Sequence, residues 1–144
     1  IFYIIGDGPE KIKLYKLVKK LSLGNDIKFV GKVPPEKISS KLKKLDFYIN
    51  SSDFEGFPNS VVEALSHNIP VIASQSFGGI NEILVGKKFG YIYSSDYELK
   101  EILNKIILQK INLKINKTKL FNHLNRFSEK ENYKKYDNLF KSII

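Results

Sequence analysis

Short apolar runs alternate along the chain with longer segments in which apolar residues recur every three or four positions. The first run, Ile1–Ile5, predicts a continuous apolar strand, and Gly6-Asp7-Gly8-Pro9 turns the chain into a helix with one apolar face. The same pairing of strand and helix then recurs. The predicted strands cover residues 1–5, 27–31, 46–50, 70–74 and 90–93.

Such alternation is typical of a parallel sheet with helices on both faces. We therefore predict a Rossmann-like α/β fold, with residues 1–144 as a single domain. From about residue 113 the chain is expected to be helical only. Ser128 is the expected N-cap of the last helix, whose apolar stripe is Tyr133, Tyr136, Phe140 and Ile143, and Asp96 is the expected N-cap of the helix after the fifth strand.

Composition narrows the class of protein. The chain has 144 residues, 42% of them hydrophobic, which is enough for one domain with a core. Without Cys it has no disulfides or cysteine metal sites, and its two isolated His residues disfavour zinc; we expect His123 at the surface. The apolar runs are too short to span a bilayer and no signal peptide is visible, so we expect a soluble protein. The lack of Cys suits a reducing compartment, and we expect the protein to be cytoplasmic. Because the sequence enters a strand at once, without Met, we expect a piece of a longer protein.

The net charge of +9 comes mainly from Lys residues spread along the predicted helices. Lys in this arrangement most often forms a solvated face, and attraction to an anionic lipid or substrate is the second interpretation. Nucleic acid is the weakest candidate, because Arg126 is the single Arg and there is no Trp. We therefore predict no nucleic-acid partner and keep open a peripheral contact with the inner face of an anionic membrane.

Two carboxylates, Glu55 and Glu63, bracket a Gly/Pro turn between the strand at 46–50 and the helix that follows it. In open α/β sheets, ligands bind at the carboxyl ends of the strands, and a helix N-terminus there offers N–H groups to a phosphate. Carboxylates accept hydrogen bonds from hydroxyls. The layout therefore suits a nucleotide sugar, which carries hydroxyls at both ends and phosphates between them.

Each candidate also has a structural interpretation. Ser60 and Glu63 fit a capping box, in which Glu63 satisfies the backbone N–H of Ser60. Glu55 is alternatively an exposed loop acid. Gly6-Asp7-Gly8-Pro9 is either a tight turn or a close approach to a diphosphate, and Gly78-Gly79 is either a turn or a second backbone approach to ligand.

In this order, the motifs resemble the C-terminal, donor-binding domain of retaining glycosyltransferases with the GT-B fold. That family includes many lipopolysaccharide, capsule and glycolipid enzymes. The matching motifs keep the family's order over roughly residues 1–98: Ile4-Ile5-Gly6-Asp7-Gly8-Pro9, Phe29-Val30-Gly31, Asp46 through Ser51, the Glu55 to Glu63 spacing, Glu63-Ala64-Leu65, Pro70-Val71-Ile72, Gly78-Gly79 with Glu82, and Gly90.

The resemblance implies transfer of a hexosyl group from a nucleotide-diphosphate sugar to a glycan or lipid-linked acceptor, with retention and without a cofactor or metal. Glu55 would be the catalytic residue that contacts and places the donor sugar, and Glu63 would hold the ribose hydroxyls. Gly6 would lie beneath the phosphates. The backbone N–H groups that would meet the sugar and pyrophosphate belong to the loop and the helix start: Gly56, Phe57, Asn59, Ser60 and Val61.

One departure from the family pattern concerns the start of the domain. The family opens with a strand and helix that carry an Arg and a Lys for the diphosphate, whereas Ile1 here corresponds to the second strand. We therefore expect the order 3-2-1-4-5-6 to lack its central strand. The acceptor-binding N-terminal domain is expected elsewhere in the protein, so the isolated chain should be inactive. A nucleotide-sugar epimerase of the same fold and a non-catalytic nucleotide-sugar-binding module stay open as alternatives.

Overall fold

The computed structural model describes residues 1–76, 78–85, 88–111 and 115–143. These residues form two compact units, Ile1–Lys41 and Leu42–Ile144. Leu113, where we expect the helical C-terminal part to begin, lies outside the described residues.

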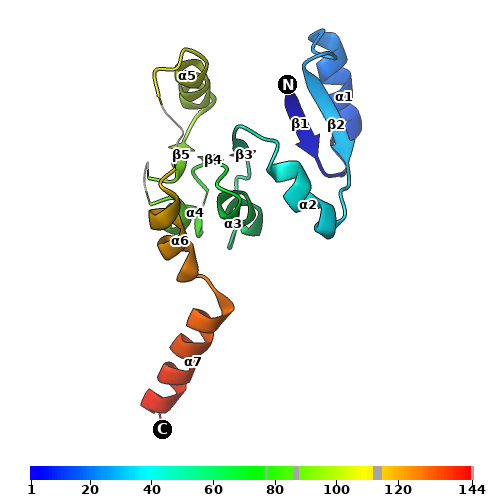
Figure 1. Ribbon diagram of the computed structural model, residues 1–144. Helices are drawn as coiled ribbons and strands as arrows, with labels where there is room; N and C mark the ends of the chain where they lie inside the picture. Colours follow the sequence, from blue (N-terminus) through cyan, green and yellow to red (C-terminus); the bar gives the residue numbers. More distant parts are fainter. Residues whose placement is uncertain (77, 86–87, 112–114, 144) are drawn as a thin grey trace. The chain divides into compact units, whose positions relative to one another are not determined.

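The first unit is a two-stranded parallel sheet with a crossover helix. β1 (Phe2–Ile5) pairs with β2 (Ile27–Gly31), and Phe2 lies opposite Ile27. α1 (Lys11–Lys20) connects the two strands (Figure 1). α2 (Pro35–Leu42) follows β2 and ends on a buried leucine that begins the second unit.

The apolar face of α1 stays largely exposed. Leu14, Leu17 and Leu21, which share this face, are 39%, 48% and 54% exposed, and α1 has no buried residue. The helix is held to β2 by a small apolar contact, in which the rings of Tyr15 and Phe29 lie 5.1 Å apart. The predicted helix is therefore confirmed, but its stripe does not form a core within the first unit.

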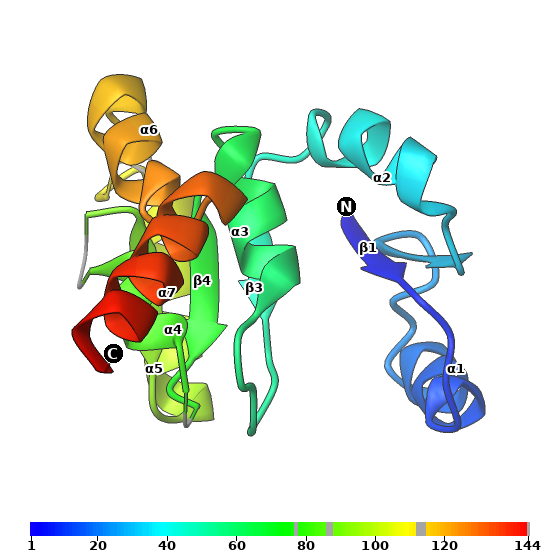
Figure 2. The same ribbon diagram turned by 90° about the horizontal axis from the view of Figure 1, so that it is seen from below.

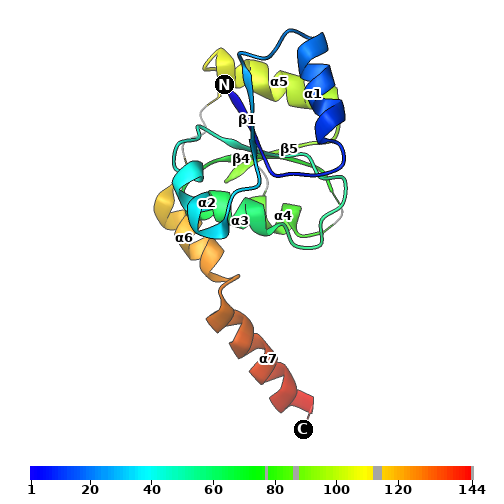
Figure 3. The ribbon, with the colours of Figure 1, turned by 90° about the vertical axis from the view of Figure 1, so that its right-hand side faces the viewer.

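The second unit contains a three-stranded parallel sheet in the order β3 (Tyr48–Asn50), β4 (Val71–Ser74) and β5 (Gly90–Tyr93). Helices cover both faces of this sheet. Figures 1 and 3 show one group of helices on one side and a single helix on the other. The group comprises α3 (Asn59–Ser66), α4 (Ile80–Leu84) and α6 (Lys117–Asn125), and the single helix is α5 (Asp96–Ile107).

The core of the second unit surrounds β4. Val71, Ile72 and Ala73 have no exposed surface, which is why this strand is a continuous apolar run. α3 lies against β3 and β4 (Figure 2) and buries Val61, Ala64 and Leu65 there. Full burial of a side chain the size of leucine contributes about 1.5–3 kcal/mol. The loop that connects β3 to α3 therefore stands on the best-packed part of the chain.

The described strands form two sheets rather than one, since no pairing between β1 and β3 is present among them. Parallel strands, helices on both sheet faces and a helical C-terminal end confirm the predicted α/β class. Within the residues that the structure describes, no helix is long and apolar enough to cross a membrane.

The helix starts were predicted with mixed success. Ser128 does cap α7 (Glu129–Ile143), because its hydroxyl accepts a hydrogen bond from the Glu131 N–H at 3.4 Å. The N-cap of α5 is Ser95 rather than Asp96: its hydroxyl accepts from the Glu98 N–H at 3.2 Å. The apolar stripe of α7 is not buried, and this helix projects away from the sheet in Figures 1 and 3.

Candidate functional site

The loop at residues 51–58 carries Glu55 at the carboxyl end of the second sheet and leads into the helix that carries Glu63. β3 ends at Asn50, and α3 begins at Asn59. Glu55 lies in the loop and is partly buried. Glu63 is exposed on α3, on the same face as Asn59, because residues four positions apart are neighbours on a helix. One carboxylate thus precedes the N-terminus of α3 and the other follows it.

The capping-box interpretation of Ser60 and Glu63 is wrong. The N-cap position of α3 is Pro58, which makes no side-chain capping bond, so Ser60 already lies in the first turn. Among the described residues, no hydrogen bond joins the Glu63 carboxylate to another group. Helix capping therefore does not account for Glu63.

Glu55 is held by hydroxyl groups that the sequence analysis did not identify. The Ser52 hydroxyl donates to Glu55 Oε1 at 2.9 Å. Ser52 is itself held at its backbone, because its N–H donates to Asn50 Oδ1 at 3.3 Å and its carbonyl accepts from the Ser74 hydroxyl. Glu55 is therefore not a free loop acid but is tied to the ends of β3 and β4. A hydroxyl residue three positions before an acid in a turn is the signal that points to such a bond.

Gly78 and Gly79 approach the backbone of this same loop. The Gly79 N–H donates to the Gly56 carbonyl at 3.0 Å. Gly78 has φ +118°, and a Cβ there would lie only 1.8 Å from the Glu55 carbonyl oxygen. The sequence left open whether these glycines form a turn or approach a ligand with their backbone. In the structure they lie against the backbone of the loop at Glu55 and Gly56.

The backbone N–H groups at the start of α3 differ in how far they are already used. Asn59 donates to the Phe57 carbonyl and Val61 donates to the Pro58 carbonyl, each at 3.0 Å. For Ser60, the part of the chain that the structure describes contains no hydrogen-bond acceptor for its N–H. Of the three N–H groups of Asn59, Ser60 and Val61, that of Ser60 is therefore the one that can meet a ligand without rearrangement.

A row of rings connects the loop to the C-terminal helices. The Phe57 ring lies 5.5 Å from the Phe127 ring, and the His123 ring lies 5.4 Å from Phe127 and 4.9 Å from Phe89. His123 Nε2 is 2.8 Å from the Ile83 carbonyl oxygen, and because a carbonyl only accepts, this nitrogen carries the hydrogen. His123 is half-buried, so its expected place at the surface is wrong.

Gly6 belongs to the first unit and opens the turn between β1 and α1. Its φ is +130°, its N–H donates to the Gly31 carbonyl at 2.9 Å, and a Cβ there would meet nothing within 4 Å. The next residue, Asp7, accepts hydrogen bonds from Lys11 Nζ and from the Gly8 N–H, each at 3.0 Å. The bond from Lys11, with that from Gly8, lowers the pKa of the Asp7 carboxyl below its usual value. The turn is open to solvent and holds an ion pair.

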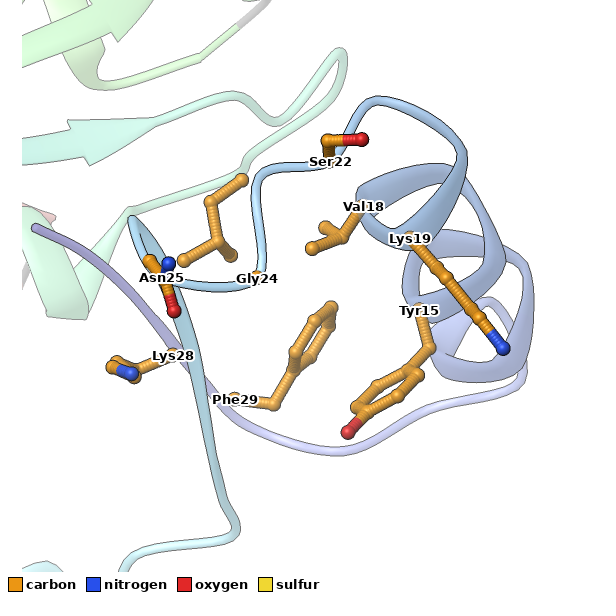
Figure 4. A pocket seen from close by; sticks show the side chains of 9 residues that line it. Tyr15, Val18, Lys19, Ser22, Gly24, Asn25, Lys28 and Phe29 are labelled. Atoms are coloured by element: carbon orange, nitrogen blue, oxygen red, sulfur yellow. The ribbon is translucent and has the colours of Figure 1, made fainter.

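Two hollows lie elsewhere in the units. One of about 560 Å³ lies between α1 and β2 of the first unit, and Figure 4 shows Tyr15, Val18 and Phe29 lining it. Another of about 490 Å³ lies between α3 and α6, lined mainly by Leu65, Leu120, Phe121 and Leu124. Neither is lined by a predicted site residue. The described residues contain no group of three His, Asp or Glu side chains that could hold a metal ion.

Comparison with known proteins covers most of the chain. The family model Glycosyl transferases group 1 matches residues 1–119. An uncharacterized glycosyltransferase of Methanocaldococcus jannaschii is 38% identical over an alignment of 119 residues, which covers 77% of this chain and 29% of that relative. The lipopolysaccharide 1,6-galactosyltransferase of Escherichia coli is 29% identical over 146 residues, covering 99% of this chain and 39% of the relative.

Solved structures give the same result. The apo form of the lipopolysaccharide outer core galactosyltransferase WaaB matches 99% of this chain with a TM-score of 0.84 at 25% identity, and 40% of its own chain is covered. Anabaena HepE in complex with UDP and glucose matches 96% of this chain and 40% of its own, with a TM-score of 0.79 at 25% identity. The chain thus spans less than half the length of these relatives. On the extent of the family match and the shared fold, the chain belongs to the glycosyl transferases group 1 family and corresponds to the donor-binding domain of GT-B enzymes.

Proposed function

We propose that this chain supplies the donor site of a retaining glycosyltransferase that moves a sugar from a nucleotide-diphosphate sugar to a glycan or lipid-linked acceptor. One observation carries the proposal. Glu55 is fixed at the carboxyl ends of β3 and β4, while Glu63 presents a carboxylate on the exposed face of α3. A donor with hydroxyls at both ends and phosphates between them fits two carboxylates separated by a helix N-terminus.

Each group in the site has a proposed role. Glu63 accepts hydrogen bonds from the ribose hydroxyls, and Glu55 contacts the donor sugar and places it for transfer. The diphosphate lies at the N-terminus of α3, where the helix dipole and the N–H groups favour negative charge. The N–H groups assigned to sugar and pyrophosphate are those of Gly56, Phe57, Asn59, Ser60 and Val61; Asn59 and Val61 must exchange bonds that they make within the loop.

No metal or cofactor is needed in this proposal. The N-terminus of α3 and basic side chains stabilise the charge that develops on the leaving diphosphate. Gly6, in the first unit, keeps the role beneath the phosphates that the family resemblance assigns to it. Its φ of +130° favours glycine, and a Cβ there would meet nothing within 4 Å.

We further propose that this donor domain works with an N-terminal, acceptor-binding domain, so the isolated chain does not transfer sugar at a normal rate. The support is that the chain spans 29% and 39% of two relatives that are named as glycosyltransferases. Further cationic groups for the diphosphate would then come from a strand and helix that precede β1 in such a protein.

The proposed place of work is the cytoplasm, with peripheral contact at the inner face of the membrane. α1 holds five Lys and no acidic residue. Lys11 and Lys13 form ion pairs with Asp7 and Glu10, whereas the other three Lys of α1 form none within the described part of the chain. Anionic lipid attracts such a face by about 1 kcal/mol per Lys near the surface. Co-sedimentation with vesicles that contain phosphatidylglycerol, but not with phosphatidylcholine alone, would support this contact, and equal binding would contradict it.

The donor site is tested by substitution in the full-length protein. Transfer and binding are measured with UDP-glucose, UDP-galactose, UDP-N-acetylglucosamine and GDP-mannose, and Glu55→Ala and Glu63→Ala are compared with Glu129→Ala, an exposed acid on α7. Loss of a hydrogen bond to a charged group lowers a binding constant or a rate constant by about 10-fold or more. We expect Glu63→Ala to weaken nucleotide binding by that factor and Glu55→Ala to lower turnover, with Glu129→Ala unchanged.

The same experiment separates the alternatives. Unchanged turnover in both variants would contradict the donor-site assignment. Epimerised donor without any acceptor would favour the epimerase, and tight nucleotide-sugar binding without transfer by the full-length protein would favour a binding module.

A further inference from the structure

We propose that Ser52 is a positioning residue, whose hydroxyl holds the Glu55 carboxylate in the orientation that meets the donor sugar. The inference rests on the proposed function, because it assumes that Glu55 contacts the donor. It adds a residue that acts through Glu55 and need not touch the ligand itself.

Ser52 is suited to this role because its own position is fixed. Its N–H donates to the side-chain oxygen of Asn50, which is 5% exposed at the end of β3. Its carbonyl accepts from the Ser74 hydroxyl at the end of β4. Residues at the ends of two neighbouring strands thus hold the backbone N–H and carbonyl of Ser52, which carries the hydroxyl.

The bond to Glu55 leaves one carboxylate oxygen for the ligand. The Ser52 hydroxyl donates to Oε1 at 2.9 Å, whereas within the described residues no group donates to Oε2. A bond to an ionised carboxylate is charge-assisted and therefore stronger than a neutral one. It restrains a flexible side chain before the donor arrives, so less conformational entropy is lost on binding.

Glu55 depends on this restraint because its loop offers little else that fixes the side chain. Gly78 and Gly79 contact the loop at its backbone, through the Glu55 and Gly56 carbonyls. Those contacts set where the chain runs but leave the carboxylate to rotate about its own bonds. A misplacement of about 1 Å in a reacting group lowers turnover by as much as about 100-fold. Ser52 is the described contact that controls the carboxylate directly.

Three variants of the full-length enzyme test the role. Ser52→Ala removes the hydroxyl that donates to Glu55, and Ser52→Thr keeps a hydroxyl. Ser51→Ala is the matched control, because Ser51 is exposed and makes no hydrogen bond within the described part of the chain. Turnover is measured with the nucleotide sugar that the enzyme uses fastest among UDP-glucose, UDP-galactose, UDP-N-acetylglucosamine and GDP-mannose. The Kd for the matching nucleoside diphosphate and the melting temperature are measured in parallel.

We expect Ser52→Ala to lower kcat by about 10-fold. The Kd for the nucleoside diphosphate should stay within about 2-fold, since that ligand carries no donor sugar for Glu55 to contact. Ser52→Thr should restore most of the turnover, and Ser51→Ala should match the wild type. This split between turnover and nucleotide binding is what a merely structural role would not produce.

Two outcomes would overturn the role of Ser52. In the first, Ser52→Ala keeps full turnover while Glu55→Ala loses it, so that Glu55 works without its tether. In the second, Ser52→Ala loses nucleotide binding and melting temperature together, so that the residue only stabilises the fold. If Glu55→Ala itself keeps full activity, or none of the four donors is used, the proposed function is wrong. The role of Ser52, which depends on it, is then wrong as well.

Discussion

Two contacts fix Glu55, one at its backbone carbonyl and one at its carboxylate. Its carbonyl faces Gly78, whose φ of +118° favours glycine, and its carboxylate is bonded to Ser52. Both contacts lie at the carboxyl ends of the strands. A change at either contact therefore alters the candidate site without touching either predicted carboxylate.

Gly78→Ala is expected to destabilise the second unit by about 3 kcal/mol, since the new Cβ both overpacks the loop and needs a strained backbone. Urea unfolding measures the change. Gly24→Ala serves as the control, because a Cβ there would meet nothing within 4 Å. Equal unfolding midpoints for the two variants would show that the loop accommodates the new Cβ without losing stability.

His123→Ala is expected to lower the free energy of unfolding by about 2 kcal/mol. The substitution leaves the Ile83 carbonyl without its donor and removes the ring stacked on Phe89. Asn122→Ala, at an exposed neighbouring position on α6, should change stability by less than about 0.5 kcal/mol. If both variants unfold alike, His123 does not stabilise the contact between α6 and α4.

The residue scale also shows what the sequence can predict about a site. Glu55 and Glu63 were found from their spacing around a strand-to-helix turn, which is a local pattern. Ser74, Gly78 and His123 act across distances of many residues, and their partners are defined only once β4, α4 and α6 have packed. The predicted roles of Glu55 and Glu63 in binding stay predictions.

At the scale of elements, the ends of helices were harder to predict than the helices themselves. α3 begins before Ser60, and α5 is capped by Ser95 although Asp96 is an equally good capping residue by type. The choice depends on which residue has an extended backbone, and Ser95 has φ −152° and ψ 158°. Side-chain type alone does not contain that information.

We expect Ser95→Ala to destabilise the chain by about 1 kcal/mol, because the Glu98 N–H loses its acceptor. Asp96→Ala should have a smaller effect, since Asp96 only adds charge to the first turn. Thermal unfolding of the two variants, compared with the wild type, gives the order. A larger loss of thermal stability for Asp96→Ala would show that Asp96, the residue predicted from the sequence, is the N-cap of α5.

At the scale of the whole molecule, the alternation of strands and helices was enough to predict the α/β class and the parallel pairing. The alternation did not reveal that the chain divides into two compact units. That division depends on which strands pair, and no pairing joins β1 to β3 among the described strands. The exposure of the apolar stripes of α1 and α7 depends equally on tertiary packing, so periodicity alone could not show it.

The exposed stripe of α7 should make the isolated chain associate. Tyr136 and Phe140, which are neighbours on this stripe, are 63% and 62% exposed. The double variant Tyr136→Lys, Phe140→Lys should sediment as a smaller species than the wild type. Its free energy of unfolding should stay within about 0.5 kcal/mol, because neither residue is buried.

The control for this variant adds the same two charges elsewhere on α7. Asn138→Lys with Ser142→Lys changes exposed positions off the stripe and should leave association as it is in the wild type. If the control dissociates the chain equally, net charge rather than the apolar stripe governs association.

The contact of Gly78 and Gly79 with the backbone of the loop has a consequence for engineering. Because the path of the loop is set by main-chain atoms, the side chains at its tip are free to change without moving it. Asp53 is exposed and Phe54 is 77% exposed, so neither side chain is needed to hold the loop in place. A combinatorial library at these two positions would vary the chemistry beside Glu55 while the frame around it stays constant. If Glu55 contacts the donor sugar as proposed, they are the first positions to vary when a new donor preference is sought.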